Sequence, residues 1–164
     1  MLIRSFVPAD LPRLVDLTIE TFGPFYENSF RPLVGDVVFA NQHGDWRGDY
    51  RTQVPELHDP AAHRYVAVAE IGAEIGAAIV GYVAWTVDPA RRNASLTHLA
   101  VDAGHRRRDA GRTLCEHAFA RMRALGAEVV EIGTGGDPFH APARALYERL
   151  GCVQLPVAVY YREL

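Results

Sequence analysis

Four arginines between a predicted strand and a predicted helix are the first residues in this chain that could do chemistry. They fall within seven residues: Arg106, Arg107, Arg108 and Arg112. The run 95–101 before them has the composition of a strand, and a helical pattern begins at Gly111. A helix N-terminus presents unpaired backbone N–H groups, and guanidinium groups add charge-assisted hydrogen bonds. Consecutive arginines alone are typical of a solvated turn, but this position favours a phosphate-binding turn.

The segment that holds these arginines, residues 101–114, resembles the acyl-CoA-binding signature of the GNAT N-acetyltransferase superfamily. That signature reads Arg/Gln-x-x-Gly-x-Gly/Ala after a strand, and Arg106 and Gly111 occupy its first and last positions. Asp109 stands where the family usually has its first glycine, so an acid there could weaken the phosphate site. Aspartate tolerates left-handed backbone conformations better than most residues, and we therefore expect the turn to form.

A second segment, residues 140–152, resembles the family's Asn-x-x-Ala-x-x-Leu-Tyr-x-x-x-Gly-Phe pattern. The matching residues are Ala143, Leu146, Tyr147 and Gly151. His140 replaces the usual asparagine, and Cys152 replaces the usual phenylalanine. The two motifs stand in the family's order, and the resemblance covers the chain except for about residues 23–62.

The resemblance implies an α/β (α+β) fold, with residues 1–164 as a GNAT-like single domain. A central mixed, mostly antiparallel sheet is flanked by helices, and a splayed acetyl-CoA cleft opens between strands 96–101 and 128–132. The implied reaction is direct transfer of an acetyl group from acetyl-CoA, the co-substrate, to an amine; no metal is implied. The implied cofactor-binding residues are Leu99, Ala100, Val101, Arg106, Arg107, Arg108, Asp109, Ala110, Gly111, Arg112, Thr113, His140 and Ala143.

Tyr147 is the candidate catalytic residue, because in the family the matching tyrosine is often assigned the protonation of the departing sulfur. A phenol with a reference pKa of about 10 is protonated at neutral pH and can act as that acid. Residues 143, 146, 147 and 150 share one helix face, so packing in the core is the alternative role.

The base that deprotonates the acceptor amine has two candidates, His98 and Glu131, and bulk water is a third possibility. Ser95, Thr97 and Leu99 alternate onto one face of their strand while His98 points to the other, unless a bulge intervenes.

Several other chemistries are excluded by composition and spacing. All 17 basic residues are arginines, and the absence of lysine excludes a Walker A loop, a Schiff-base enzyme and a Ser-Lys hydrolase. No serine lies in a Gly-x-Ser-x-Gly elbow, and the seven histidines match no common zinc spacing. The loop 133–136 does not fit Gly-x-Gly-x-x-Gly, and we interpret it as a tight turn.

The elements in the first half of the chain follow from hydrophobic periodicity. A short strand over 2–7 precedes a helix that Asp10 could cap and that should end at Gly23 and Pro24. One or two short helices are expected in the aromatic-rich stretch up to residue 60. Its Trp46 and Tyr50 would either wall the acceptor pocket or fill the core.

The second half predicts a hairpin of strands 65–71 and 78–87, followed by the strand 95–101. The next helix should bury a stripe of four residues and stop at Gly126: Leu114, Ala118, Met122 and Leu125. A strand over 128–132, a helix over 142–150 and one or two strands over 152–162 complete the order.

Composition limits the partners and the location. The chain has 164 residues, 49% of them hydrophobic, and a net charge of −3, which gives no global attraction to nucleic acid or to a membrane. We expect a cytoplasmic protein, since neither a secretory signal nor a disulfide framework is evident. Arginine without lysine hints at a GC-rich, bacterial genome, and a homodimer is possible for so small a domain.

Two other functions remain open. An inactive GNAT-like module could sense acyl-CoA without turning it over. An interaction domain could instead expose an aromatic patch of seven residues: Phe22, Phe25, Tyr26, Phe30, Phe39, Trp46 and Tyr50.

Overall fold

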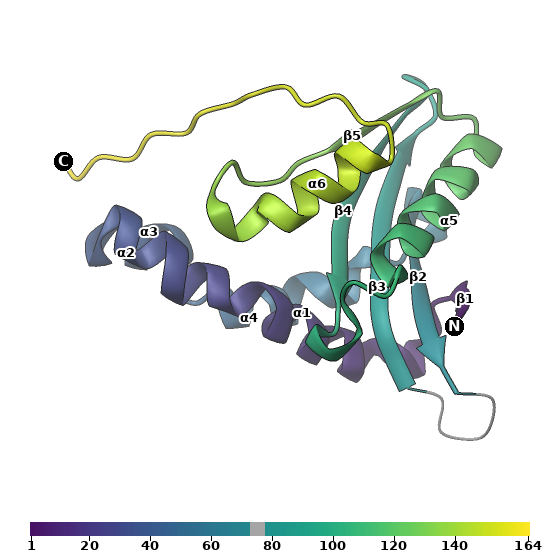
Figure 1. Ribbon diagram of the computed structural model, residues 1–164, viewed down its shortest axis with the longest axis horizontal. Coiled ribbons are helices and arrows are strands. Elements are labelled where there is room, and N and C mark those ends of the chain that lie inside the picture. The colour runs from purple at the N-terminus through teal and green to yellow at the C-terminus, as the bar shows by residue number, and fades with distance from the viewer. Residues whose placement is uncertain (73–77) are drawn as a thin grey trace.

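The computed structural model describes residues 1–72 and 78–164, which form a five-stranded sheet with helices on both faces (Figure 1). The strands are β1 (Leu2–Ser5), β2 (Arg64–Ile71), β3 (Ala78–Asp88), β4 (Asn93–Val101) and β5 (Val129–Ile132). The helices are α1 (Leu11–Phe25), α2 (Arg31–Val34), α3 (Asp36–His43), α4 (Trp46–Gln53), α5 (Ala110–Ala124) and α6 (Ala141–Arg149). The sheet order is β1-β2-β3-β4-β5, antiparallel throughout except for the parallel pair β4 and β5. This architecture confirms the predicted fold class; the turn of the predicted hairpin lies outside the described residues.

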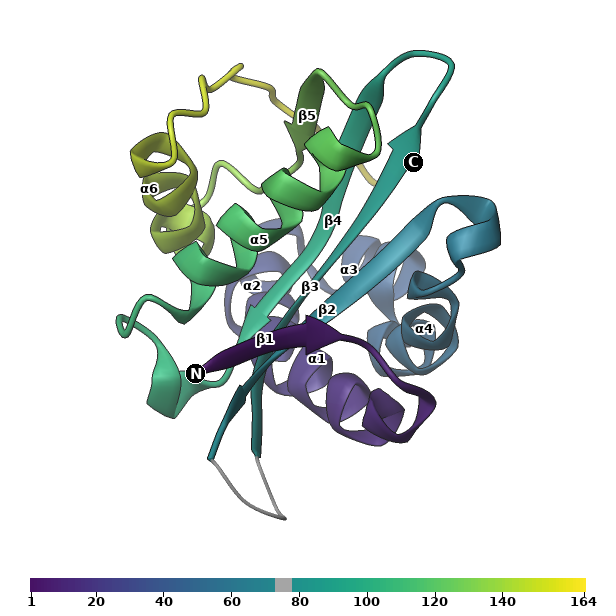
Figure 2. The same ribbon diagram turned by 90° about the vertical axis from the view of Figure 1, so that its right-hand side faces the viewer.

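The two faces of the sheet are covered by different helices, α5 on one side and α1 with α4 on the other (Figure 2). Side chains of β2 alternate between the two faces, as the period of two requires. Val66 and Val68 pack in the cluster that contains Leu14 and Leu17 of α1. Odd-numbered neighbours such as Ala67 pack instead in the cluster on the α5 side.

Helix α5 buries most of its predicted stripe against the sheet. Leu114, Ala118 and Met122 are buried, whereas Leu125, which was also expected there, is 37% exposed. Leu125 already lies beyond the helix end, where the chain turns away from the sheet through Gly126 with a φ of +90°.

Helix α1 does not end at Gly23 and Pro24, and that expectation was wrong. The helix runs to Phe25 and continues through a π-helical turn into α2. Gly23 serves packing here: a Cβ on it would lie 2.6 Å from Cη2 of Trp46. Pro24 stands one residue before the end of α1, where a proline removes a single backbone hydrogen bond.

The aromatic residues of the first half form a buried cluster between α1, α3 and α4. Phe30, Phe39 and Trp46 are buried, and the Trp46 indole stacks on Tyr26 at a centroid distance of 5.1 Å. None of the seven aromatic residues named above is classed as exposed, so the alternative of an exposed aromatic patch was wrong. The short helices fold back on α1 and cover these rings, which also makes Trp46 a core residue.

The C-terminal segment 152–164 forms no strand, and the prediction of one or two strands there was wrong. Its residues Val153, Leu155 and Val157 are 96%, 80% and 83% exposed. An alternating apolar pattern becomes a strand only where a sheet edge receives it. This segment instead runs from α6 toward α2 and α3 (Figure 1), where the ring centroids of Tyr161 and Phe30 are 5.6 Å apart.

In the part of the chain that the structure describes, no helix combines the length and apolar character that a membrane crossing needs.

Candidate active site

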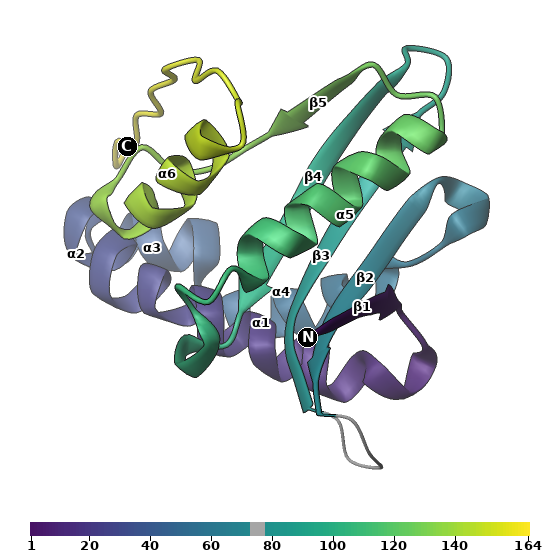
Figure 3. The same cartoon turned by 45° about the vertical axis from the view of Figure 1, so that its right-hand side comes forward.

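The sheet is open between β4 and β5, as the family resemblance implied. The two strands pair only over Asn93 to Leu96 of β4 and Val129 to Ile132 of β5. Strand β4 then continues to Val101, while the chain after β5 turns away toward α6 (Figure 3). The described residues therefore place no strand against the outer edge of β4 beyond Leu96.

The backbone of this open stretch points partly into the gap. The Asp102 N–H donates to the Val80 carbonyl over 2.8 Å, which fixes the alternation of hydrogen bonds between β4 and β3. By that alternation Ala100 turns its backbone groups toward β3, whereas Leu99 and Val101 turn theirs into the gap. Two of the three predicted pantetheine-binding residues therefore offer free backbone groups.

A β-bulge at Thr97 lies where the two strands part. His98 is opposite Ala84 and Leu96 is opposite Trp85, so Thr97 is an extra residue in β4. Its Oγ1 donates a hydrogen bond to the Ala84 carbonyl over 3.2 Å. The extra residue reverses the alternation of side chains along the strand.

The reversed alternation changes which residues share a face. Leu99 packs on the α5 side, as Leu96 does, and Ala100 packs on the α1 side. The sequence analysis predicted that Ser95, Thr97 and Leu99 share one face unless a bulge intervenes, and the bulge at Thr97 is the exception that occurs.

The turn after β4 begins at Asp102, which collects three hydrogen bonds. Its Oδ1 accepts from the Gly104 N–H and lies 2.9 Å from His105 Nδ1, and Oδ2 accepts from Arg13 Nη2 on α1. The hydrogen bond from His105 is the main cause that lowers the pKa of Asp102 below its ordinary value. These contacts fix the start of the turn on α1.

The three consecutive arginines are exposed on this turn. Arg106 folds back, and its Nε donates to the Val101 carbonyl over 3.1 Å. Arg107 adopts a left-handed backbone with a φ of +60°. Arg106 thus lies at the open edge of β4 and takes one of its carbonyl groups.

Asp109 precedes the helix in the left-handed conformation that the sequence analysis expected, with a φ of +59°. Helix α5 starts at Ala110, which is buried, and the Asp109 carbonyl accepts hydrogen bonds from the Thr113 N–H and hydroxyl. Gly111 faces α6 and β4: a Cβ there would lie 3.3 Å from Leu146 Cδ2 and 3.9 Å from Val101 Cγ2. Glycine therefore keeps the base of the gap free of a side chain.

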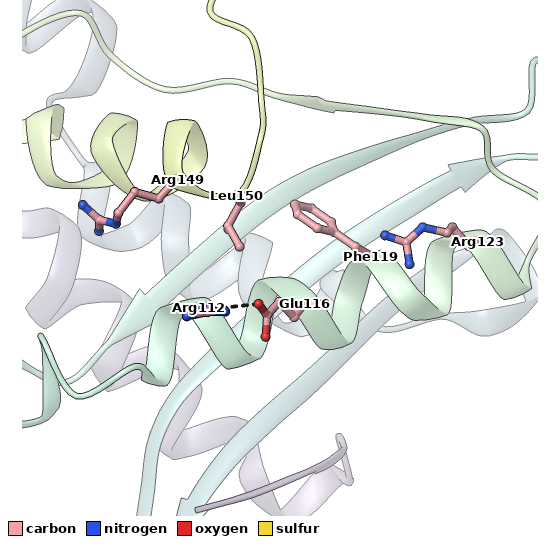
Figure 4. A pocket seen from close by; sticks show the side chains of 6 residues that line it. All are labelled: Arg112, Glu116, Phe119, Arg123, Arg149 and Leu150. Atoms are coloured by element: carbon pink, nitrogen blue, oxygen red, sulfur yellow. Dashed lines mark hydrogen bonds and ion pairs between the residues drawn. The ribbon is translucent and has the colours of Figure 1, made fainter.

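Arg112 lines a groove between α5 and α6 and lies beside Glu116 on α5 (Figure 4). Its Nε donates to Glu116 Oε1 over 2.9 Å, one helical turn further along. The groove has a volume of about 370 Å³ and is lined by Arg112, Glu116, Phe119, Arg123, Arg149 and Leu150. The Arg112 guanidinium is thus held by Glu116 on its own helix.

Tyr147 is half-buried on α6, one turn after Ala143, and packs against the core on the α5 side. Burial raises the pKa of its phenol above the ordinary value, and the neighbouring Cys115 and Cys152 act in the same direction. The phenol is therefore neutral at physiological pH. Within the described residues its hydroxyl makes no hydrogen bond, so it remains free to donate one.

The two candidate bases lie in different surroundings. His98 is on the α1 face between Phe22, Tyr50 and Tyr82, with centroid distances of 6.3 to 6.5 Å. Burial lowers its pKa to about 4. Glu131 is exposed on β5, opposite Ser95.

The ring nitrogens of His98 are poorly placed for proton transfer. Nε2 lies 3.3 Å from Oε1 of Gln53, and Nδ1 is buried without a partner among the described residues. A ring so enclosed is neutral but is a weak base.

His140 lies at the N-terminal end of α6 and forms a pair that sequence reasoning missed. Its Nδ1 is 2.5 Å from Oδ2 of Asp137, three residues earlier. Burial is the largest single influence and would raise the pKa of Asp137, but the hydrogen bond and charge of His140 together with backbone hydrogen bonds outweigh it, and the pKa is lowered. The signal in the sequence was the Asp-Pro-x-His spacing at a helix start. In the described part of the chain, no group of acidic, histidine and cysteine side chains could hold a metal ion.

Comparisons with known proteins agree with this geometry. The Acetyltransferase (GNAT) family matches residues 20–152. A curated streptothricin acetyltransferase from Streptomyces lavendulae is 34% identical over 139 residues, which are 84% of this chain and 66% of that relative. The match thus spans slightly less than two thirds of the relative's length.

Two solved structures illustrate the likeness of fold. An acetyltransferase of the GNAT family from Desulfovibrio desulfuricans gives a TM-score of 0.65 at 20% identity, over 91% of this chain and 82% of that one. AAC(6')-Iy was solved in complex with the bisubstrate analogue CoA-S-monomethyl-acetylneamine. It gives a TM-score of 0.66 at 13% identity, over 99% of this chain and 97% of that one. With the family match over most of its length and with the same open sheet, the chain belongs to the acetyltransferase (GNAT) family.

Proposed function

We propose that this protein transfers an acetyl group from acetyl-CoA directly to an amine. The observation that supports it most is the open edge of β4, which leads straight into the N-terminus of α5. The backbone groups of Leu99 and the N–H of Val101 suit the amides of a pantetheine arm, as another strand would, while the Val101 carbonyl accepts from Arg106. The N–H groups from Arg106 to Arg112 suit the pyrophosphate, whereas the Thr113 N–H already donates to the Asp109 carbonyl.

Tyr147 is proposed as the general acid of this reaction. The amine nitrogen forms a bond to the thioester carbon, and the tetrahedral intermediate then breaks its C–S bond. The neutral phenol of Tyr147 protonates the departing sulfur, and the proton that the attacking nitrogen loses restores the phenol. Because burial disfavours the phenolate, the tyrosine is held in the protonated form that this step needs.

Tyr147→Phe tests this role because it removes only the hydroxyl. We expect kcat to fall by roughly 10²-fold while acetyl-CoA affinity and Tm are kept. Tyr160→Phe is the matched control, since Tyr160 is 90% exposed, and it should change nothing. An unchanged kcat in Tyr147→Phe would make the tyrosine a packing residue, with the proton coming from solvent.

The acceptor is best sought with a panel of amines and a thiol-release assay. The streptothricin acetyltransferase relative and the acetylneamine part of the bisubstrate analogue bound to AAC(6')-Iy make streptothricin and neamine the first acceptors to test. Binding of acetyl-CoA without turnover of any amine would instead support the alternative function, an acyl-CoA sensor. Calorimetry with acetyl-CoA alone shows whether the cofactor binds, and the thiol-release assay shows whether it is turned over, so the two measurements together separate the two functions.

A further inference from the structure

The loop between β5 and α6 holds a histidine and an aspartate in a rigid arrangement. Asp137 Oδ1 accepts the Phe139 N–H over 2.9 Å, while Oδ2 faces His140 Nδ1. Arg144 Nη1 donates to the carbonyl groups of Gly135 and Asp137, over 2.5 and 2.7 Å. Both carboxylate oxygens and the loop backbone are therefore fixed in place.

This arrangement decides which nitrogen of His140 can accept a proton. An ionised carboxylate only accepts hydrogen bonds, so the nitrogen beside it, Nδ1, carries a hydrogen. In the neutral ring Nε2 is then the acceptor. The side chain is 20% exposed, and Nε2 is not among the buried polar atoms without a partner in the described residues. Nε2 is thus open to a ligand.

Gly135 is the residue that allows the pair to form. A Cβ on Gly135 would clash with Asp137 Oδ2 and would lie 2.5 Å from His140 Nδ1. Its φ is not in the left-handed region, so glycine is needed here for space and not for backbone conformation. The neighbouring Gly136 has nothing within 4 Å of its own Cβ position and carries no such constraint.

Helix α1 links this pair to the strand that opens the sheet. Phe25 lies edge-on to the His140 ring, with the ring centroids 4.8 Å apart. Phe22 lies edge-on to His98 of β4, with the centroids 6.3 Å apart. The two phenylalanines are three residues apart and share one side of the helix. The C-terminal half of α1 therefore spans from β4 to the start of α6, below the gap where β4 and β5 part (Figure 1).

We propose that Nε2 of His140 accepts a proton from the ammonium group of the acceptor, and that Asp137 positions the ring for this step. The inference rests on the proposed acetyl transfer. The ammonium loses one proton to Nε2, the resulting amine attacks the thioester carbon, and the imidazolium releases its proton to solvent. Asp137 stabilises the imidazolium while it exists and holds the ring in one orientation. His140 is thereby a catalytic residue, and Asp137, Gly135 and Arg144 are positioning residues.

The test uses variants that separate the two ring nitrogens. In His140→Asn the amide nitrogen can still donate to Asp137, but no group accepts a proton at neutral pH. We expect kcat/KM for the amine to fall by about 10²-fold and the acidic limb of its pH profile to disappear. The Kd of acetyl-CoA, measured by calorimetry, should stay within about twofold of the wild type.

Asp137→Asn and Gly135→Ala test the positioning role. Asp137→Asn keeps the acceptor for the Phe139 N–H but turns its amide N–H₂ toward Nδ1 of His140. Nδ1 then accepts a hydrogen bond, the hydrogen of the neutral ring moves to Nε2, and kcat/KM for the amine should fall because Nε2 can no longer accept a proton. Gly135→Ala should lower kcat/KM by pushing the pair apart, whereas Gly136→Ala, the matched control, should not.

Three outcomes would overturn the inference. An unchanged pH profile in His140→Asn would exclude the proton transfer. A rise in the acetyl-CoA Kd as large as the fall in kcat/KM would make His140 a cofactor contact only. A wild-type protein that binds acetyl-CoA but acetylates no amine would overturn the proposed function itself, and this inference with it.

Discussion

His98 should make the protein sensitive to acid, and the effect can be isolated with one substitution. Burial lowers the pKa of the folded imidazole from 6.5 to about 4, so below pH 6.5 the unfolded chain binds a proton that the folded protein resists. This contribution to stability is complete above pH 6.5 and is lost as the pH falls toward 4. The loss over the whole window amounts to ~3 kcal/mol, of which ~2 kcal/mol is lost by pH 5.

The measurement is urea unfolding of the wild type and of His98→Gln at a neutral and at an acidic pH. Glutamine is similar in size, has no charge to gain and can still bond to Gln53. Between about pH 7.5 and pH 5 the wild type should lose ~2 kcal/mol more of its unfolding free energy than the variant. His43, His58 and His117, whose pKa values burial also lowers, contribute equally to both proteins. An equal loss in the two proteins would refute the assignment of a buried, neutral His98.

Two further predictions concern the phosphate-binding turn. Gly111→Val should raise the acetyl-CoA Kd by at least about tenfold, because its Cβ would meet Leu146 at 3.3 Å and its methyl groups would enter the gap beside β4. Arg91→Ala, outside the turn, is the control in the same calorimetric titration, and equal affinities of the Gly111 variant and the wild type would remove this site. Asp109→Gly keeps the left-handed turn at a φ of +59° and removes a negative charge near the phosphates. The Kd should fall several-fold at low salt and the gain should shrink at high salt; an unchanged Kd would show that the carboxylate does not face the anion.

Most of the strands and long helices could be predicted from the sequence because their signals are local. The apolar run of β3 and the stripe of α5 identify their elements without knowledge of the partner. Gly126 and Gly151 end their helices with φ values of +90° and +83°, as a glycine after a helical pattern predicts. The same rule failed at Gly23, because that glycine makes room for Trp46 of another helix. A glycine needed for packing and a glycine needed for a turn look alike in one sequence.

The candidate site was partly predictable for the same reason. The arginine turn and the segment around Tyr147 are contiguous motifs that can be recognised before any contact is known. The partnership of Asp137 with His140 also lies within four residues, but its meaning depends on the space that Gly135 leaves and on the ring of Phe25. The prediction for the C-terminal segment failed in the opposite way. The segment has the pattern of a strand, but it lies toward α2 and α3 and away from the sheet, where Tyr161 packs against Phe30.

The extra residue in β4 divides one continuous strand into two parts in which odd-numbered and even-numbered side chains point to opposite faces. Before Thr97 the even-numbered side chains Ala94 and Leu96 belong to the α5 face, and after it the odd-numbered Leu99 and Val101 do. Over the whole strand the two opposed alternations cancel, which obscures the amphipathic pattern of the strand that lines the gap. Insertion or deletion of one residue elsewhere in β4 would reverse the side-chain alternation in only one of these two parts. Substitutions on either side of Thr97 must therefore be compared by face and not by parity of residue number.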